Sequence, residues 1–119
     1  MNWKFMKTRS KKAKGRRFQN WVRDELLIRF PKLTEEDVYC AIMGERGVDI
    51  KLSAKAKKII PFAIECKNQE TFKKIYKDYG QAIYNANKQQ PALFIKMNQQ
   101  QPLVVLDAKY FLDWISYGK

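Results

Sequence analysis

Three charged side chains near the middle of the chain have the types and spacing of a small phosphodiester-cleaving site. Asp49 lies 16 residues before Glu65, and Lys67 lies two residues after Glu65. Because successive side chains of a strand point to opposite faces, Glu65 and Lys67 share a face if this segment is extended. Two carboxylates on one face can bind Mg²⁺ or Mn²⁺, and an ammonium group can offset the charge that develops at a phosphate.

The rest of the composition narrows the chemistry. The chain has two cysteines, Cys40 and Cys66, and no histidine. Zinc fingers of the Cys/His type, Ser-His-Asp hydrolases and histidine-dependent nucleases all need an imidazole, so these classes are excluded. Two cysteines do not form the disulfide framework of a small secreted protein. Catalysis would therefore depend on carboxylates, lysine and a hard metal ion bound through oxygen.

Basic residues outnumber acidic residues by 24 to 12, and the excess is concentrated near the N-terminus. Residues 1–17 hold eight lysines and arginines and no acid, which leaves the remainder with a net charge of +4. Such a segment gains most beside a polyanion, because each phosphate it neutralises releases counterions. The distribution predicts a nucleic-acid partner, with a solubilising tail as the alternative. We expect residues 1–14 to form a flexible basic arm and residues 15–119 a single domain.

The apolar content indicates where the protein works. No apolar run approaches the ~18 residues of a membrane-spanning helix, and the N-terminus lacks the apolar centre of a signal peptide. Trp3, Phe5 and Met6 are too few to form an amphipathic helix on a membrane surface. We therefore expect a cytoplasmic protein with neither a membrane partner nor a nucleotide cofactor.

The elements that must position the three charged groups are indicated by hydrophobic periodicity. Residues 16–30 have helical spacing, and Pro31 ends this segment. Thr34, with Asp37 three residues later, has the pattern of an N-cap and predicts a second, short helix. Residues 38–43 can instead begin a strand.

The central segment has the two-residue period of strands. Residues 48–53 and 60–67 alternate between apolar and polar side chains, and residues 54–58 form a lysine-rich segment that we interpret as a turn. This hairpin brings Asp49 onto the face of Glu65. Charges on the outer face of a hairpin are often only solvated, which is the alternative interpretation. The second strand is otherwise apolar, however, and this favours a central position, where unused charges are unfavourable.

The C-terminal half completes the expected fold. Residues 71–88 are predicted to form a long helix, in which Gly80 marks a close contact or a kink. Residues 91–97 and 102–107 are predicted strands, and Asp107 is expected to cap a final helix. The order of these elements predicts an α/β fold, an α+β arrangement with a mixed sheet.

At this point the residues resemble a known family. The runs 47–50 (Gly-Val-Asp-Ile) and 64–67 (Ile-Glu-Cys-Lys) resemble the motif of the PD-(D/E)XK nuclease superfamily. The order helix, three strands, helix, strand resembles its common core, and the resemblance spans residues 15–107. The small size, the basic N-terminus and a helix carrying Gln81 before a Pro-Ala-Leu-Phe-Ile-Lys strand are most similar to archaeal and phage Holliday-junction resolvases. The resemblance implies a restriction-endonuclease-like core with a short extra helix and a C-terminal helix.

The resemblance also implies a function. It implies a Mg²⁺- or Mn²⁺-dependent endodeoxyribonuclease that cleaves branched DNA as a homodimer in a bacterial, archaeal or phage-infected cell. Asp49 and Glu65 are expected to bind the metal ion, and Lys67 to position or activate the nucleophile. Gln81 is expected to place water or DNA, or else to be an ordinary polar helix residue. A nuclease that nicks or trims duplex DNA and a non-catalytic DNA-binding module are the alternatives.

One position departs from the pattern of these resolvases. Their first helix commonly supplies a further acid four residues after a glycine, and here Gly15 is followed by Gln19. Because an amide is a weaker metal ligand than a carboxylate, either fewer charges hold the ion or another acid substitutes. Glu25 is the candidate, since the helical period turns it inward, although it can also lie at the edge of the core. A homologue that has lost metal binding is a further alternative.

The remaining candidates are side chains that can contact DNA. Ser53 shares the predicted face of Asp49 and can hydrogen-bond a phosphate, or only water. Tyr76, Tyr79 and Tyr84 are interpreted as core or dimer contacts. The basic residues expected to contact phosphates without reading bases are Lys11, Lys12, Lys14, Arg16, Arg17, Arg46, Lys51, Lys55, Lys57 and Lys58.

Overall fold

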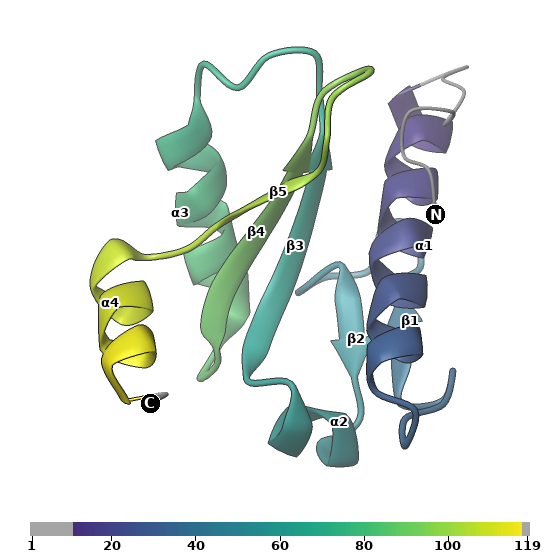
Figure 1. Ribbon diagram of the computed structural model, residues 1–119. Coiled ribbons are helices and arrows are strands. Elements are labelled where there is room, and N and C mark those ends of the chain that lie inside the picture. Colours follow the sequence, from purple (N-terminus) through teal and green to yellow (C-terminus); the bar gives the residue numbers. More distant parts are fainter. Residues whose placement is uncertain (1–10, 118–119) are drawn as a thin grey trace.

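The computed structural model describes residues 11–117, with side chains as far as Trp114. This part of the chain forms a mixed α/β structure with four helices and one five-stranded sheet (Figure 1). In chain order the elements are α1 (Lys11–Arg29), β1 (Val38–Cys40), β2 (Ile50–Leu52), α2 (Ala54–Ile59), β3 (Phe62–Asn68), α3 (Ile75–Ala86), β4 (Gln90–Lys96), β5 (Leu103–Val105) and α4 (Ala108–Tyr117). The predicted mixed sheet is confirmed.

The strands follow one another across the sheet in chain order, with β3 at the centre. Neighbouring strands are antiparallel except β3 and β4, which are parallel and are connected by α3. Strands β2 and β3 pair through Ile50 and Ile64, whereas β3 pairs with β4 along its whole length. The half of β3 that follows Ile64 therefore has a strand on one edge only, and its other edge is open to side chains.

The sheet is covered by a helix on each face of its centre. Helix α1 packs against β1 and β3, and α3 packs against β3 and β4 on the opposite side (Figure 1). Under α1 the core is built from large apolar side chains, among them Phe18, Val22, Ile50 and Ile64, each at most 2% exposed. Beneath α3 the buried apolar side chains include three small ones, Ala63, Ala82 and Ala86, together with Leu93.

Helix α1 includes residues that the sequence assigned to the basic arm. Residues 11–14 are helical, so the predicted arm boundary at residue 14 is corrected; the rest of that segment, 1–10, lies outside the described residues. The reason is periodicity. Lys14, Phe18 and Val22 recur every four residues and are the buried residues of α1, so the inward stripe extends one turn before Phe18.

The helix predicted after Thr34 does not form. The Thr34 N–H donates to Asp37 Oδ2 over 3.0 Å, and the Glu36 N–H donates to Thr34 Oγ1 over 3.3 Å, as in an N-cap. These bonds close a single turn, after which Val38 enters the core with no exposed surface and begins β1. The alternative prediction, a strand from residue 38, is confirmed for Val38–Cys40.

The lysine-rich segment between the two central strands is a helix, not a turn. Ser53 is the N-cap of α2, and its Oγ accepts a hydrogen bond from the Ala56 N–H over 3.1 Å. Alanine and lysine are good helix formers, and the segment contains no glycine, proline or asparagine to break a helix. The antiparallel pairing of β2 with β3 holds despite this longer connection.

The C-terminal elements agree with the predictions apart from their bounds. Helix α3 begins at Ile75, four residues later than predicted. A Cβ added to Gly80 would meet nothing within 4 Å, so the predicted close contact is absent from this part of the structure. Asp107 caps α4 as expected, because its Oδ1 accepts from the Tyr110 N–H over 2.8 Å. Among residues 11–117, no helix combines the length and apolar character needed to cross a membrane.

Candidate active site

Asp49 is held at the open edge of β3, just before β2 begins. Its N–H donates to the Ile64 carbonyl over 3.2 Å, which continues the pairing of the two strands by one residue. Its Oδ2 accepts from the Cys66 N–H over 2.8 Å. The carboxylate thus takes the place of the strand partner that β3 lacks beyond Ile64, and this fixes its position against the Glu65–Lys67 segment.

Glu65 is almost fully buried, at 4% exposed, on the face of β3 that α3 covers. Its Oε1 accepts from Asn85 Nδ2 over 3.0 Å. Loss of hydration, followed by the charge and hydrogen bonding of the adjacent Asp49 carboxylate, raises the pKa of Glu65 to about 8. The Asn85 amide and the charge of Lys67 act in the opposite direction. Glu65 therefore holds a proton at neutral pH when no cation lies beside it.

A polar cavity of about 590 Å³ opens over this pair. Its walls come from α1, the loop before β2, the second half of β3 and the C-terminal half of α3. They are formed by Gln19, Glu45, Arg46, Gly47, Asp49, Glu65, Cys66, Lys67, Gln81, Tyr84 and Asn85. The cavity thus brings together the four residues predicted to be catalytic and one of the three supporting candidates, Gln19.

The donor set of the cavity suits a small hard cation. Mg²⁺ commonly keeps several waters and is bound through one or two protein carboxylates together with substrate phosphates. Asp49 and Glu65 supply two such carboxylates, and Gln19 and Gln81 add amide oxygens to the lining. Within residues 11–117, no group of three or more histidine, cysteine or acidic residues is arranged to hold a metal ion. The residues present therefore fit a weakly ligated, largely hydrated Mg²⁺ and not a closed structural site.

Two supporting candidates are placed elsewhere. Glu25 accepts from Arg29 over 2.9 Å and lines a separate hollow beside Phe94. It lies six residues from Gln19, roughly 9 Å along the helix axis, so it does not replace the missing acid. The Ser53 hydroxyl donates to Asp37 Oδ1 over 2.7 Å and caps α2, so it faces away from the cavity. The alternative interpretation of Glu25, a side chain at the edge of the core, agrees with this placement, whereas the prediction for Ser53 is corrected.

The predicted phosphate contacts have different environments. Lys14 is one of the buried residues of α1 and is 4% exposed, so the expected surface contact with a phosphate is wrong for this residue. Lys51 donates to the Arg46 carbonyl over 2.7 Å and forms an ion pair of 3.4 Å with Glu45. Arg17 is partly buried. The exposed members of the set are Lys11, Lys12, Arg16, Arg46, Lys55, Lys57 and Lys58.

Asn85 and Tyr84 are cavity residues that were not recognised from the sequence. Asn85 contacts Glu65 directly, and the available signal was its position four residues after Gln81, which places both on one side of a helix. Tyr84 was interpreted as a core or dimer contact, but it is 87% exposed and lines the cavity. A core role for Tyr84 is therefore wrong.

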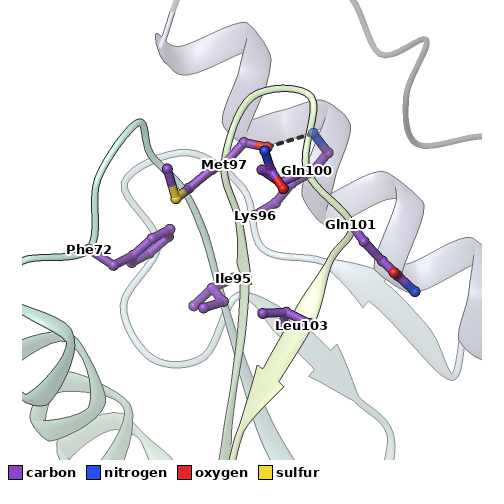
Figure 2. Close-up of a pocket in the computed structure, with 7 residues that line it drawn as sticks. All are labelled: Phe72, Ile95, Lys96, Met97, Gln100, Gln101 and Leu103. Atoms are coloured by element: carbon purple, nitrogen blue, oxygen red, sulfur yellow. Dashed lines mark hydrogen bonds between the residues drawn. The ribbon is translucent and has the colours of Figure 1, made fainter.

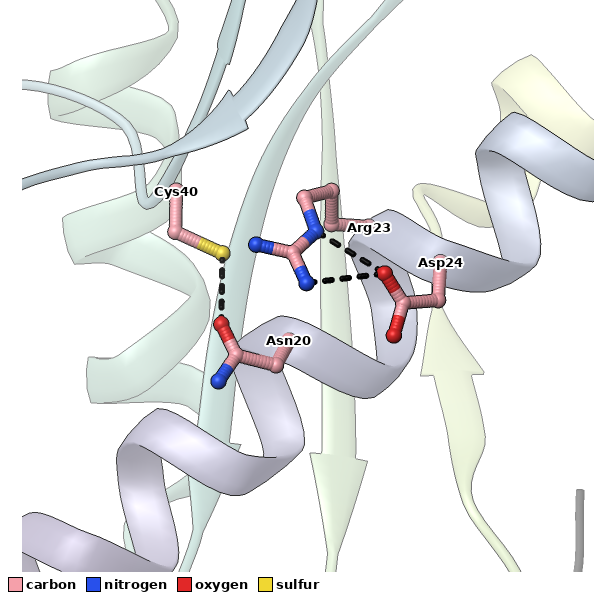
Figure 3. A network of polar contacts seen from close by, with 4 residues as sticks. All are labelled: Asn20, Arg23, Asp24 and Cys40. Atoms are coloured by element: carbon pink, nitrogen blue, oxygen red, sulfur yellow. Dashed lines mark hydrogen bonds and ion pairs between the residues drawn. The ribbon is translucent and has the colours of Figure 1, made fainter. Parts of the chain in front are cut away.

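The neighbourhood of Gln19 is tied to the sheet by a small polar network (Figure 3). The next residue, Asn20, accepts from Cys40 Sγ over 3.4 Å, which connects α1 to β1. One turn further along α1, Arg23 donates to Asp24 over 2.9 Å. Both Cys40 and Cys66 are free thiols, as expected from the cysteine content.

Another hollow, of about 370 Å³, shows what a site without this chemistry looks like (Figure 2). Its walls are largely apolar, with Phe72, Ile95 and Leu103 facing it between the β4–β5 turn and the loop before α3. Lys67 pairs with Ile95 across β3 and β4, so this hollow lies one strand beyond the cavity. Among the residues that the structure describes, none of those lining this hollow is acidic.

Comparisons of the chain with protein-family models, with curated proteins and with solved structures find no match. The residues and geometry of the cavity therefore carry the functional interpretation.

Proposed function

We propose that the chain is a Mg²⁺-dependent endodeoxyribonuclease that hydrolyses phosphodiester bonds, and that it acts as a homodimer on branched DNA. The observation that carries the nuclease proposal is the meeting of the Asp49 and Glu65 carboxyl groups in a cavity that also receives Lys67. A divalent cation that replaces the proton of the buried Glu65, beside the Asp49 carboxylate, offsets the cost of ionising this glutamate.

Each residue has a separate role in this proposal. Asp49 and Glu65 would hold Mg²⁺, which when bound lowers the pKa of a coordinated water and polarises a phosphate. Asn85 keeps the Glu65 carboxylate oriented through its 3.0 Å hydrogen bond. Lys67 follows Glu65 on the same face, roughly 7 Å along the strand, where its ammonium can position the nucleophile or offset charge on the phosphate.

The choice of DNA rests on charge. The protein has a net charge of +12, and Arg46 lies at the cavity wall beside the acids. Preference for branched DNA, and the dimer that two paired incisions require, rest on the resemblance to Holliday-junction resolvases. A nuclease that nicks or trims ordinary duplex DNA uses the same residues, so cleavage of a four-way junction must be compared with cleavage of a linear duplex.

A non-catalytic DNA-binding module is the second candidate. Two observations favour it: Gln19 stands where the resolvases commonly have an acid, and the described residues contain no cluster of three metal ligands. In that case the cavity would bind DNA without hydrolysing it.

The test is a cleavage assay with a four-way junction and a linear duplex of matched sequence, in Mg²⁺ or Mn²⁺. We expect wild-type protein to cleave and Glu65→Gln to be slower by about 100- to 1,000-fold, the loss typical of removing one electrostatic contact to the reacting group. Glu36→Gln is the matched control, because Glu36 is exposed in the turn before β1.

The outcomes separate the candidates. Undiminished cleavage by Glu65→Gln would contradict the site. Equal cleavage of both substrates would favour the duplex nuclease. DNA binding without cleavage in either metal would favour the binding module.

A further inference from the structure

A basic groove adjoins the active-site cavity. It has a volume of about 360 Å³ and lies between β2 with α2 on one side and the end of α3 on the other. It shares Gly47 and Asn85 with the cavity, so the two hollows are adjacent. We define the basic groove by its three lysines, Lys51, Lys57 and Lys88, together with residues 85–89.

The cavity is mixed in charge, whereas the groove is basic. Three acids, Glu45, Asp49 and Glu65, line the cavity together with Arg46 and Lys67. Within the part of the chain that the structure describes, no aspartate or glutamate lines the groove. The candidate cation site therefore lies beside a lysine-lined groove. This is the arrangement that a phosphate backbone needs if one of its phosphates is to meet a metal ion and its neighbours are to meet ammonium groups.

Two of the three lysines are available to a ligand. Lys51 is already engaged, because it contacts Glu45 and the Arg46 carbonyl. Lys57 and Lys88 are exposed, and neither forms an ion pair with a carboxylate in the part of the chain that the structure describes. They come from different elements, Lys57 from α2 and Lys88 from the segment after α3. Both walls of the groove thus offer a positive charge.

A glycine lies at the boundary between the two hollows. Gly47 lines both, and its φ of +94° is a conformation that L side chains rarely adopt. A Cβ at this position would lie 3.0 Å from Lys51 Nζ, so any larger residue would displace the ammonium group of Lys51. Gly47 therefore lets Lys51 approach the backbone at this boundary.

The amides of the groove are mostly occupied in holding its walls. Gln89 Nε2 donates to the Ile60 carbonyl over 3.2 Å, and Asn85 Nδ2 donates to Glu65. The groove therefore presents ammonium groups to a ligand and few side chains that could read a base. Such contacts add affinity and position a strand, but they carry no sequence information.

We propose that the nucleic-acid strand that continues from the scissile phosphate lies in the basic groove, with Lys57 and Lys88 contacting its phosphates. This inference rests on the proposed nuclease function, because the cavity supplies the reference phosphate. It extends that function by assigning the path of the strand on one side of the cut.

The test measures the salt dependence of DNA binding by the full chain in the absence of Mg²⁺, with chelator present. The variants are Lys57→Gln, Lys88→Gln and the double substitution, and Lys109→Gln on α4 is the control, because Lys109 is also an exposed lysine. The slope of the logarithm of the binding constant against the logarithm of the salt concentration is negative. Each groove substitution should reduce its magnitude by about 0.7 on single-stranded DNA or 0.9 on duplex. The double variant should reduce it by the sum of the two single reductions, and the control should leave it unchanged.

A thermal unfolding curve accompanies each variant, because Lys88 follows the C-terminus of α3, where a cation also favours the helix dipole. A less steep salt dependence with an unchanged unfolding temperature supports the contacts of Lys57 and Lys88 with the strand. An unchanged slope in the folded double variant overturns them.

Cleavage by the same proteins in Mg²⁺ separates the two proposals. If wild-type protein cleaves and the double variant has an unchanged salt slope, the proposed strand path through the basic groove is wrong and the nuclease proposal stands. If wild-type protein does not cleave but the salt slopes become less steep, the nuclease proposal fails, and the groove stands as a strand-binding surface alone.

Discussion

The two faces of β3 are both buried, but they bury opposite kinds of side chain. Ile64 and Glu65 are neighbours in the chain and are 2% and 4% exposed. Ile64 packs under α1 against Phe18 in a dry apolar core, whereas Glu65 faces α3 and hydrogen-bonds Asn85 beside a polar cavity. The alternation of a single strand thus separates the scaffold from the site by one residue. Substitutions on the first face should change stability, and those on the second should change the response to pH and metal.

The largest effect is expected at the centre of the apolar face. Phe18→Ala removes a side chain with no exposed surface and should lower the free energy of unfolding by about 3–5 kcal/mol, measured by urea denaturation. Tyr76→Ala, at a position 91% exposed, is the control and should change stability by less than about 0.5 kcal/mol. A loss at Phe18 no larger than that at Tyr76 would mean that α1 does not pack on β3 as described.

The second effect concerns the ionisable face and its sign. Burial beside Asp49 raises the pKa of Glu65 from 4.5 to about 8, so between these pH values the folded state holds a proton that the unfolded state has lost. Stability of the metal-free protein should therefore fall with rising pH across this window, by at most about 1.4 kcal/mol per pH unit from this group. Glu65→Gln should flatten the decline, as measured by unfolding temperature in chelator from pH 4 to pH 9.

Magnesium provides the check on this second prediction. A ligand that binds only the folded state raises stability, and ionised Glu65 should bind Mg²⁺ better than its protonated form. The stabilisation by Mg²⁺ should thus be larger above pH 8 than below pH 6 and should be lost in Glu65→Gln. A decline with pH that persists unchanged in Glu65→Gln would place its origin in another group.

The third effect concerns Ser53, whose position in the structure differs from the predicted one. Ser53 was predicted to lie beside Asp49, but it caps α2 and donates to Asp37. Ser53→Ala should lower the free energy of unfolding by about 1–2 kcal/mol, while cleavage per folded molecule stays at the wild-type rate. Ser53→Thr, which keeps a hydroxyl, should restore most of the stability. Lost cleavage in folded Ser53→Ala would return this residue to the site.

The parts of the fold that could be predicted are those set by a long periodic segment. Four-residue spacing in α1 and alternation in β3 are local patterns, and both give the correct face for Phe18 and Glu65. The same holds for the cap of α4 at Asp107. Short segments were harder, because the Thr34 cap and the lysines of α2 satisfy local rules for more than one structure. Burial of Val38, a tertiary effect, decides the first of these.

The site could be predicted in part for a similar reason. Asp49, Glu65 and Lys67 converge because two strands pair, which alternation indicates. The pairing of Asn85 with Glu65 depends on how α3 is seated on the sheet, where small side chains such as Ala82 let it approach. The packing of a helix on a sheet at this level of detail is not indicated by any local sequence pattern. The depth of Glu65, and hence its raised pKa, follows from the same packing.

The smallest effect tests that packing directly. Asn85→Ala removes the amide that donates to Glu65 Oε1 and favours its ionised form. A net hydrogen bond contributes about 0.5–1.5 kcal/mol, which corresponds to roughly half to one pH unit. The pKa of Glu65 should rise by that amount, as measured by carboxyl NMR titration in chelator.

The pH of half-maximal Mg²⁺-dependent cleavage should rise with it, and the rate at the alkaline plateau should change little. A uniform loss of cleavage at every pH, with the NMR titration unmoved, would instead assign Asn85 to substrate contact. The distinction matters for the comparison between the faces, because only a shift in titration shows that α3 acts on the chemistry of β3 by setting the charge of its glutamate.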